Sequence, residues 1–492
     1  MTISSAALYH TSQIRDCEQR AIRDSGITEA ELMARAGRAA FVLVQQSFPL
    51  AHKIVIFCGS GNNAGDGYVL ASLLHNAGYS IVINQYKSPD KLPPSARDAA
   101  LAALALGIHC HSVDEGIDND TDLIVDALLG TGLNGRVQEP LVTAITQINE
   151  SELPVLSLDV PSGLDADTGN VMGVCVRATT TITFIGQKAG MMTLDGPDQC
   201  GEIVCNDLNL TVHLSTICPV AEILDSHLSA TLLPKRLRNC HKNEFGHVLI
   251  IGGGIGMPGS VCLAANAALR VGAGVVTVAT KPVYAGQALC GLPEAMIAPI
   301  DEASCLLPLI NKATVCVIGP GLGLDEWAVQ LFRQVIASQL PMVIDASALR
   351  ILAQSPQEDD NWILTPHPGE AASLLGCRAQ DIQADRYHAA TQLQAKYGGN
   401  VVLKGVGTLV RTSEPLTWLC DRGNPGMASA GMGDVLSGVI AGLVGQGLSL
   451  ADAAKTGVWL HASAADLAVR KSGERGLLAS DLMPYLRLLV NE

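Results

Sequence analysis

A glycine-dense stretch in the last quarter of the chain, NPGMASAGMGD at residues 424–434, combines residue types suited to phosphate chemistry. Small residues let a backbone approach a phosphate closely, and backbone N–H groups at a helix start bind anions. The residues that follow, DVLSGVIAGLVGQG, have helical spacing. Asp434 therefore falls in a first helical turn, where a carboxylate either caps the helix or acts as a general base. An isolated aspartate would favour the cap, but companion loops favour the base.

The companion loops of the second half each follow an apolar run. They are GGGIGMPGS (252–260), GPGLG (319–323), TPHPGE (365–370) and KGVGT (404–408). Each has an ordinary explanation alone: glycine turns between strands and helices are common, a lone histidine usually packs or faces water, and a terminal lysine is usually solvated. Their combination in this order is what indicates a site.

The first half carries a different constellation in CGSGNNAGDGYV, residues 58–69. Its glycines are spaced wrongly for the dinucleotide fingerprint. The Asn pair and Asp66 supply amide and carboxylate oxygens, which suit a monovalent cation or ribose hydroxyls. The loops GTGLNGR (130–136) and PSGLDADTG (161–169) follow two further apolar runs. Asp126 and Asp159 lie at the ends of those runs, where a lone carboxylate usually caps the next turn.

The elements that must position these loops are short apolar strands alternating with helices. In the first half a capping box, Thr28 with Glu31, predicts a helix from residue 28 to 46. Strands are expected at 53–58, 80–86, 122–129 and 154–160, and in the second half at 246–253, 275–280, 313–319, 341–346, 361–366 and 400–405. This alternation predicts an α/β fold with parallel, doubly wound sheets, whose ligands bind outside the carboxyl ends of the strands.

Length and composition limit the possible classes. A chain of 492 residues is too long for one core, and the weakened pattern after residue 206 predicts a boundary near 222. The net charge of −15 argues against a nucleic-acid partner, and no apolar run is long enough for a membrane helix. The 14 cysteines form no C-x-x-C pair and are expected to be reduced. The N-terminus has no signal-like pattern, so we expect a soluble cytoplasmic protein.

The motifs of the second half resemble those of ribokinase-like enzymes, in the branch that includes NAD(P)H-hydrate dehydratase. The match covers residues 223–492. The resemblance implies that Asp434 is the catalytic base and that Mg²⁺ accompanies a nucleotide co-substrate, ADP. It implies a substrate side of Gly259, Gly321, His367 and Asp434. It implies nucleotide contacts from Lys404, Gly405, Val406, Gly407, Thr408, Asn424, Pro425, Gly426, Met427, Ala428, Ser429, Ala430, Gly431, Met432 and Gly433. Met432 departs from the usual threonine, so a hydroxyl contact is lost there.

The loops of the first half resemble the NAD(P)H-hydrate epimerase family, over residues 1–222 with the match strongest at 10–215. Ala64 stands where the family has glycine. The resemblance implies a potassium ion held by Asn63, Asp126 and Ser162. It implies that Asp159 and Lys188 act on the substrate. It implies substrate contacts from Asn62, Asn63, Ala64, Gly65, Asp66, Gly130, Thr131, Gly132, Leu133, Asn134, Gly135, Arg136 and Asp159.

Together the two resemblances imply one chain, expected to form a homo-oligomer, that repairs hydrated nicotinamide cofactors. One domain would interconvert the R and S hydrates, as an isomerase, and the other would dehydrate the S form with ADP, as a lyase. Two alternatives stay open. A kinase for a small alcohol shares the ribokinase-like fold, and the first domain could be a non-catalytic nucleotide-binding module.

Overall fold

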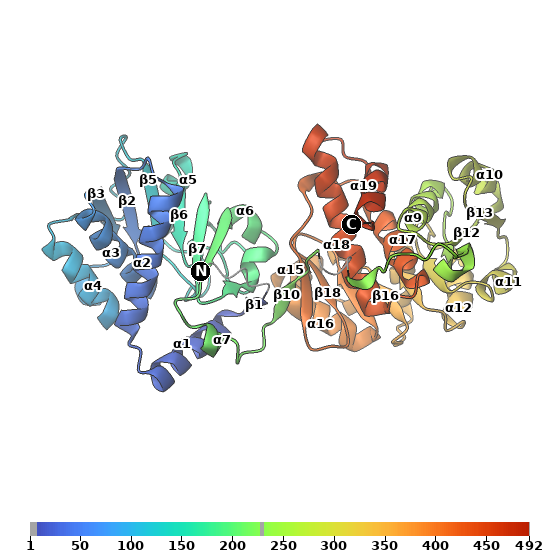
Figure 1. The fold of residues 1–492 in the computed structure, drawn as a ribbon, viewed down its shortest axis with the longest axis horizontal. Coiled ribbons are helices and arrows are strands. Elements are labelled where there is room, and N and C mark those ends of the chain that lie inside the picture. The colour runs from blue at the N-terminus through green and yellow to red at the C-terminus, as the bar shows by residue number, and fades with distance from the viewer. Residues whose placement is uncertain (1–6, 227–230, 492) are drawn as a thin grey trace. The chain divides into compact units, whose positions relative to one another are not determined.

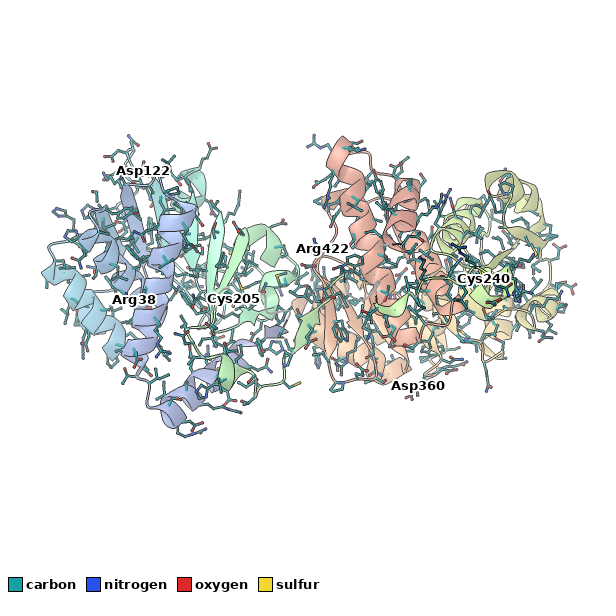
Figure 2. All side chains as sticks on the ribbon, in the orientation of Figure 1. Arg38, Asp122, Cys205, Cys240, Asp360 and Arg422 are labelled. Atoms are coloured by element: carbon teal, nitrogen blue, oxygen red, sulfur yellow. The ribbon has the colours of Figure 1, made fainter. Side chains whose placement is uncertain are left out.

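The computed structural model describes residues 7–226 and 231–491 (Figure 1). The chain divides into two compact units, Met1–Ala221 and Glu222–Glu492. In each unit side chains fill the space between a central sheet and the helices around it (Figure 2). No helix in the described ranges is both long and apolar enough to cross a membrane.

The first unit is built on a parallel seven-stranded sheet with the order β4-β3-β2-β5-β6-β7-β9. The strands are β2 (Lys53–Cys58), β3 (Ser80–Gln85), β4 (His109–Ser112), β5 (Leu123–Ala127), β6 (Val155–Leu158), β7 (Thr180–Phe184) and β9 (Glu202–Asn206). The strand order reverses between β2 and β5. At such a switch point the following loops diverge and leave a crevice for a ligand.

Helices cover both faces of this sheet. They are α1 (Thr11–Ser25), α2 (Glu29–Ser47), α3 (Asn62–Asn76), α4 (Pro94–Ala105), α5 (Leu141–Glu150), α6 (Gly196–Cys200) and α7 (Thr211–Leu214). Along β2, Ile54 and Ile56 join the core formed with α2, α3 and α4, whereas Val55 and Phe57 join the core formed with α5. Thr28 caps α2 by accepting a hydrogen bond from the Glu31 amide at 3.2 Å. A parallel pair of short strands, β1 (Ala7–Tyr9) and β8 (Gln187–Lys188), completes the unit.

In the second unit the strands follow the order β13-β12-β11-β14-β15-β16-β17-β18-β19. They are β11 (His247–Ile251), β12 (Val275–Thr280), β13 (Met296–Pro299), β14 (Val315–Ile318), β15 (Met342–Ile344), β16 (Trp362–Leu364), β17 (Asn400–Leu403), β18 (Thr408–Arg411) and β19 (Thr417–Cys420). Strands β11 to β17 pair in parallel, and β18 and β19 continue the sheet as antiparallel strands. The strand β10 (Ala221–Ile223) spans the junction of the units.

Helices of the second unit enclose its sheet in the same way. The α-helices are α9 (Pro258–Arg270), α10 (Pro282–Gly291), α11 (Leu307–Ile310), α12 (Glu326–Ile336), α13 (Ala346–Gln354), α14 (Pro368–Leu375), α15 (Ala379–Ala384), α16 (Arg386–Tyr397), α17 (Met432–Gly445), α18 (Leu450–Ser472) and α19 (Met483–Leu489). Helices α9 and α17 pack backbone against backbone. A Cβ on Gly438 would lie 2.0 Å from the Ala264 carbonyl oxygen, and one on Gly442 would lie 2.9 Å from the Ala268 oxygen. Glycine is therefore required at both positions by packing.

Candidate active sites

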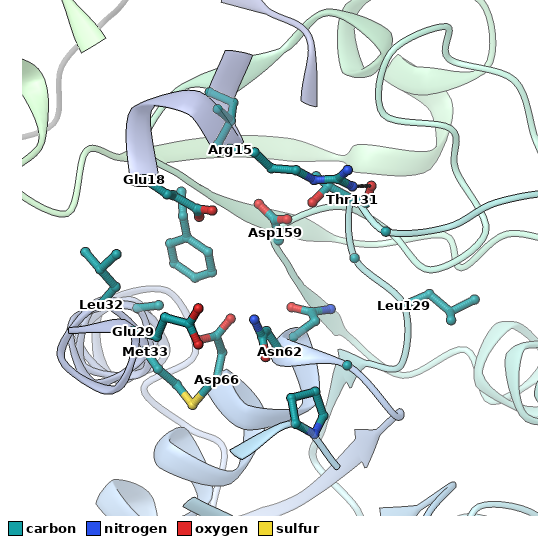
Figure 3. A pocket seen from close by; sticks show the side chains of 18 of the residues that line it. Arg15, Glu18, Glu29, Leu32, Met33, Asn62, Asp66, Leu129, Thr131 and Asp159 are labelled. Atoms are coloured by element: carbon teal, nitrogen blue, oxygen red, sulfur yellow. Dashed lines mark hydrogen bonds between the residues drawn. The ribbon is translucent and has the colours of Figure 1, made fainter. Parts of the chain in front are cut away.

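A cavity of about 790 Å³ opens in the first unit beside the β2/β5 switch point (Figure 3). Loops that the sequence predicted at one sheet edge line it together. The predicted residues on its wall are Asn62, Asn63, Asp66, Gly130, Thr131, Gly132, Leu133, Asn134, Asp159 and Lys188. Apolar side chains from α1 and α2, among them Ile14 and Leu32, form part of the wall. The cavity therefore offers both polar groups and an apolar surface for a flat ring.

Four of the predicted substrate residues do not line this cavity. Ala64 and Gly65 are buried in α3, and a Cβ on Gly65 would lie 2.4 Å from the Met33 methyl carbon, so that glycine serves packing. Gly135 and Arg136 are exposed outside the wall. Arg15 of α1 lines the cavity instead and donates to the Thr131 carbonyl at 2.8 Å. Arg15 was not predicted, because it lies far from the loop in the chain.

Asp159 and Lys188 form the central ion pair of the cavity. The Lys188 ammonium also donates to the Thr183 hydroxyl at 2.8 Å and to the Phe184 carbonyl at 3.0 Å. The lysine side chain is 1% exposed, whereas the aspartate side chain is 16% exposed and faces the cavity. Asp159 has φ of 66°, a backbone conformation that non-glycine residues rarely adopt, and such strain clusters at functional sites.

Further carboxyl groups, among them Glu18 and Asp66, project toward the same space (Figure 3). Burial and the nearby Asp159 carboxylate raise the pKa of Glu18 above its ordinary value. Burial, Asp159 and Glu18 raise the pKa of Asp66 well above its ordinary value. The cavity therefore holds two carboxyl groups with raised pKa values beside the Asp159–Lys188 pair. Glu18 was not predicted, since its helix carries no motif.

The residues predicted to hold potassium, Asn63, Asp126 and Ser162, are all buried. Both Asp126 oxygens accept hydrogen bonds, including one from the Ser162 hydroxyl at 2.5 Å and one from the Ser162 amide at 2.8 Å. Burial raises the pKa of Asp126, although these bonds oppose the shift. The side-chain oxygen and nitrogen of Asn63 are buried and have no hydrogen-bond partner among the described residues. An orphaned amide oxygen and an oxygen-rich, negatively charged neighbourhood fit a monovalent cation.

The second site begins at the N-terminus of α17. Gly431 precedes the helix with φ of 89°, and Asp434 lies in the first turn, as predicted. Burial and the nearby Asp345 carboxylate raise the pKa of Asp434 to about 6, while a Ser260 hydrogen bond and the Lys404 ammonium oppose the shift. A carboxylate with this pKa is ionised at neutral pH and remains basic enough to accept a proton.

A charge network surrounds this turn. Lys404 Nζ lies 2.9 Å from Asp345 Oδ1 and 3.8 Å from Glu370 Oε2. A Cβ on Gly433 would lie 3.2 Å from that Nζ, so glycine keeps the helix start close to the lysine. Burial disfavours ionised Asp345, but the Lys404 charge and several hydrogen bonds outweigh it and hold the pKa of that carboxyl below its ordinary value. Asp345 was not predicted, because one carboxylate at a strand end has an ordinary capping role.

The other predicted residues lie on loops that contact one another. Gly321 has φ of 58° and its carbonyl accepts from the Gly254 amide at 2.6 Å, which joins GPGLG to the loop that carries Gly259. His367 caps α14 through Nδ1, which accepts from the Gly369 amide at 3.0 Å. Its Nε2 lies 3.4 Å from Glu370 Oε1. His367 is thereby linked through Glu370 to Lys404.

The Gly-rich loop itself is anchored from outside the motif. Asp466 of α18 accepts from the Gly423 amide at 3.0 Å and from the Asn424 side-chain amide at 2.9 Å. Asn424 in turn accepts from the Gly426 amide at 3.1 Å and caps a short 3-10 helix, η5 (Pro425–Met427). Met432 is buried in the hydrophobic core, which explains how an apolar side chain replaces the usual threonine.

The second unit provides no ready-made cage for Mg²⁺. Across residues 7–226 and 231–491, no group of three or more His, Cys, Asp or Glu side chains is arranged to hold a metal ion. Asp345 is paired with Lys404 and Ser437. The protein residues alone therefore do not fit a dedicated magnesium site.

The fold and the two sites define a class: an α/β enzyme with a Rossmann-like unit and a ribokinase-like unit. Residues 29–190 match the family model described as YjeF-related protein N-terminus, and residues 248–487 match the one described as NAD(P)H-hydrate dehydratase. Among solved structures, a ribokinase-like superfamily protein from Enterococcus faecalis is 29% identical with a TM-score of 0.52, covering 56% of this chain and 97% of its own.

Full-length relatives identify the family. A bifunctional NAD(P)H-hydrate repair enzyme from Coxiella burnetii is 47% identical over 485 residues, covering 98% of this chain and 99% of the relative. The Escherichia coli protein of the same name is 41% identical, covering 98% and 94%. The chain belongs to the family of bifunctional NAD(P)H-hydrate repair enzymes. The predicted fold class, family and overall function are confirmed.

Proposed function

We propose that the second unit dehydrates NAD(P)H hydrates with a nucleotide as co-substrate and with Asp434 as the base. The observation that carries this assignment is Asp434 itself, a carboxylate with a pKa of about 6 in the first turn of α17. Around it lie the Lys404 ammonium and the N-terminus of α17, whose first N–H groups have no acceptor within the helix. A base beside an anion-binding turn is the arrangement that phosphoryl transfer to a hydroxyl requires.

The reaction follows in two stages. Asp434 removes the proton of the hydrate's hydroxyl as its oxygen bonds to the terminal phosphorus of ADP, and AMP leaves. The bond between ring carbon and oxygen then breaks, phosphate departs, and one ring proton is lost as the double bond of the reduced ring re-forms. The N–H groups at the start of α17 stabilise the charge that develops on the phosphoryl oxygens. Overall, ADP and the NAD(P)H hydrate are converted to AMP, phosphate and NAD(P)H, and the atoms balance.

Two loops hold the nucleotide in this proposal. The stretch from Asn424 to Gly433 cradles the phosphates, and Lys404 to Thr408 contact the nucleotide. Gly259, Gly321 and His367 line the hydrate's side. Because the protein residues form no dedicated cage, Mg²⁺ is expected to arrive with the nucleotide phosphates and to neutralise part of their charge.

The first unit, in our proposal, interconverts the R and S hydrates. The Asp159–Lys188 pair supports this role, because the aspartate faces the cavity while the buried lysine behind it fixes its charge and position. Asp159 takes the hydroxyl proton as the bond between the ring nitrogen and the hydroxyl-bearing carbon breaks, and returns it when that bond re-forms on the carbon's other face, so the configuration inverts and no atom is lost. The loop from Gly130 to Asn134 receives phosphate groups, and Arg15 supplies the positive charge at that wall.

Potassium is proposed at Asn63, Asp126 and Ser162. A bound cation would balance the buried Asp126 charge and give the orphaned Asn63 oxygen a partner. These residues thereby fix the two loops that follow β2 and β5, both of which line the cavity. The chemistry stays with Asp159 and Lys188.

The test is recovery of NADH absorbance from a mixture of R and S NADH hydrates. With ADP, the full chain is expected to convert both epimers and to release AMP and phosphate in equal amounts. No recovery with ADP or ATP contradicts the dehydratase assignment. Stable phosphorylation of a small alcohol instead supports the kinase alternative. If the S hydrate is recovered quickly but the R hydrate is recovered only at the rate of spontaneous epimerisation, catalysis in the first unit is contradicted.

A further inference from the structure

Arg386 is a buried cation that the proposed chemistry leaves without a role. Its side chain is 1% exposed, and it is the first residue of α16. Among the described residues, its guanidinium forms no ion pair with a carboxylate and bonds only neutral oxygens. Burial lowers the pKa of Arg386 to about 10, so the group remains charged at neutral pH.

The guanidinium lies directly behind the loop of residues 404–408. Its Nη1 donates to the Lys404 carbonyl at 3.3 Å, and its Nη2 donates to the carbonyls of Leu403 at 3.2 Å and Gly407 at 3.3 Å. These bonds hold both ends of the loop. A Cβ on Gly405 would lie 2.6 Å from Nη1, so the loop backbone also packs against the guanidinium.

This placement is unfavourable for the protein alone. Burying a charge without a counter-ion costs free energy, and a helix N-terminus repels a cation. Neutral residues could fill the same volume without that cost. In the same segment the Lys404 ammonium is already paired with Asp345, whereas the Arg386 guanidinium has no carboxylate partner among the described residues. A ligand of opposite charge is the missing partner.

We propose that Arg386 is a positioning residue of the nucleotide site: it fixes the backbone of residues 403–407 from behind, and its charge is balanced by the phosphates of a bound nucleoside diphosphate. This inference rests on the proposed nucleotide-binding role of the loop. It assigns the arginine no contact with the ligand.

The test uses the full chain with Arg386→Lys and Arg386→Met, and Arg411→Met as the matched control. Arg411 is also partly buried and holds a loop through the Pro415 carbonyl, but among the described residues its guanidinium bonds none of residues 403–407. The measurements are KM for ADP, kcat, and the increases in melting temperature caused by ADP and by adenosine. We expect Arg386→Lys to raise KM for ADP ~10-fold, as the loss of well-formed charged hydrogen bonds does, with kcat nearly unchanged. Arg386→Met should weaken the binding of ADP far more than the binding of adenosine.

Several results overturn the inference. One is a lower melting temperature with an unchanged KM for ADP, as expected for Arg411→Met. Another is that Arg386→Met weakens the binding of ADP and of adenosine equally. If Arg386→Met does not fold, Arg386→Lys decides, because it keeps the charge and loses the bonds to the loop backbone. If ADP fails to stabilise the wild-type chain, the proposed nucleotide site is what fails.

Discussion

Each unit contains a lysine–aspartate ion pair near the carboxyl ends of its strands. The two pairs differ in which partner is the more exposed one. In the first unit the lysine, Lys188, is 1% exposed and the aspartate, Asp159, is 16% exposed. In the second unit the lysine, Lys404, is 20% exposed and the aspartate, Asp345, is 2% exposed. One site presents a carboxylate to its ligand and the other presents an ammonium.

This inversion matches the chemistry that each site must perform. A carboxylate supported by a buried lysine is suited to exchanging a proton with a neutral ring. An ammonium supported by a buried aspartate is suited to holding a polyanion, and the base is then supplied separately by Asp434. The same pair of residue types therefore serves proton transfer in one unit and phosphate binding in the other.

The largest expected effect separates the two sites by their base. Asp434→Asn should lower kcat for dehydration ~10³-fold, because general base catalysis contributes on this scale, and should leave epimerisation unchanged. Because the base must be ionised, the wild-type dehydration rate should fall as the pH drops below about 6. The measurement is NADH recovery between pH 5 and 8. A variant that keeps the wild-type rate would remove Asp434 from the mechanism.

The next effect tests the inversion directly. Lys404→Met and Asp159→Asn each remove the more exposed partner and leave a buried charge unpaired, which should cost ~3 kcal/mol of stability in that unit. Asp345→Asn and Lys188→Met leave the more exposed partner, which water can reach, and should cost less. Calorimetric unfolding of the full chain measures both units. If Asp345→Asn and Lys188→Met lose more stability than Lys404→Met and Asp159→Asn, the difference in exposure does not decide which charge needs its partner.

A third prediction concerns pH and stability in the second unit. The folded pKa of Asp434, about 6, is raised above the ordinary value of 3.8. The folded state therefore binds this proton more tightly, and the associated stability is complete below pH 3.8 and lost as the pH rises through 6. At pH 7 Asp434→Asn should be the more stable protein by ~2 kcal/mol, a value set by the shift less partial solvent screening. Equal stability of both proteins from pH 4 to 7 would contradict the raised pKa.

The smallest effect distinguishes two arginines of the first unit. Arg15 lines the cavity, and Arg136 is exposed outside its wall. Arg15→Ala should raise KM for the hydrates ~5-fold through loss of a charged contact, and Arg136→Ala should change it less than twofold. Steady-state epimerisation kinetics on both variants provides the comparison. A larger increase in KM for Arg136→Ala than for Arg15→Ala would favour Arg136, the arginine predicted from the sequence, as the one that contacts the substrate.

Much of the fold followed from the sequence, because buried parallel strands are short apolar runs. The runs expected at 53–58 and 275–280 coincide with β2 and β12. Strand β7, TTITF, was missed although all five residues are buried, since three threonines hide it from a search for apolar runs. The hairpin strands β18, TLVR, and β19, TWLC, were missed for a related reason, because threonine and arginine leave only two or three consecutive apolar residues in each.

The sites divide along the same line. Loops rich in glycine and asparagine could be predicted from their composition. Most of the residues predicted in the first unit line one cavity. The residues that support them did not. Arg386 and Asp466 act through bonds to loops distant in the chain, and a single arginine or aspartate on a helix has no local signature. Only the tertiary structure brings such partners together.

The glycine contacts between α9 and α17 have a mechanical consequence. Helix α9 begins beside Gly259 on the hydrate's side, and α17 begins beside Asp434. With Gly438 and Gly442 seated directly on the backbone of α9, neither helix can slide or tilt without a backbone collision. The spacing between the base and the wall that faces it is therefore fixed before any ligand arrives. Closure of the site, where it occurs, must come from the loops.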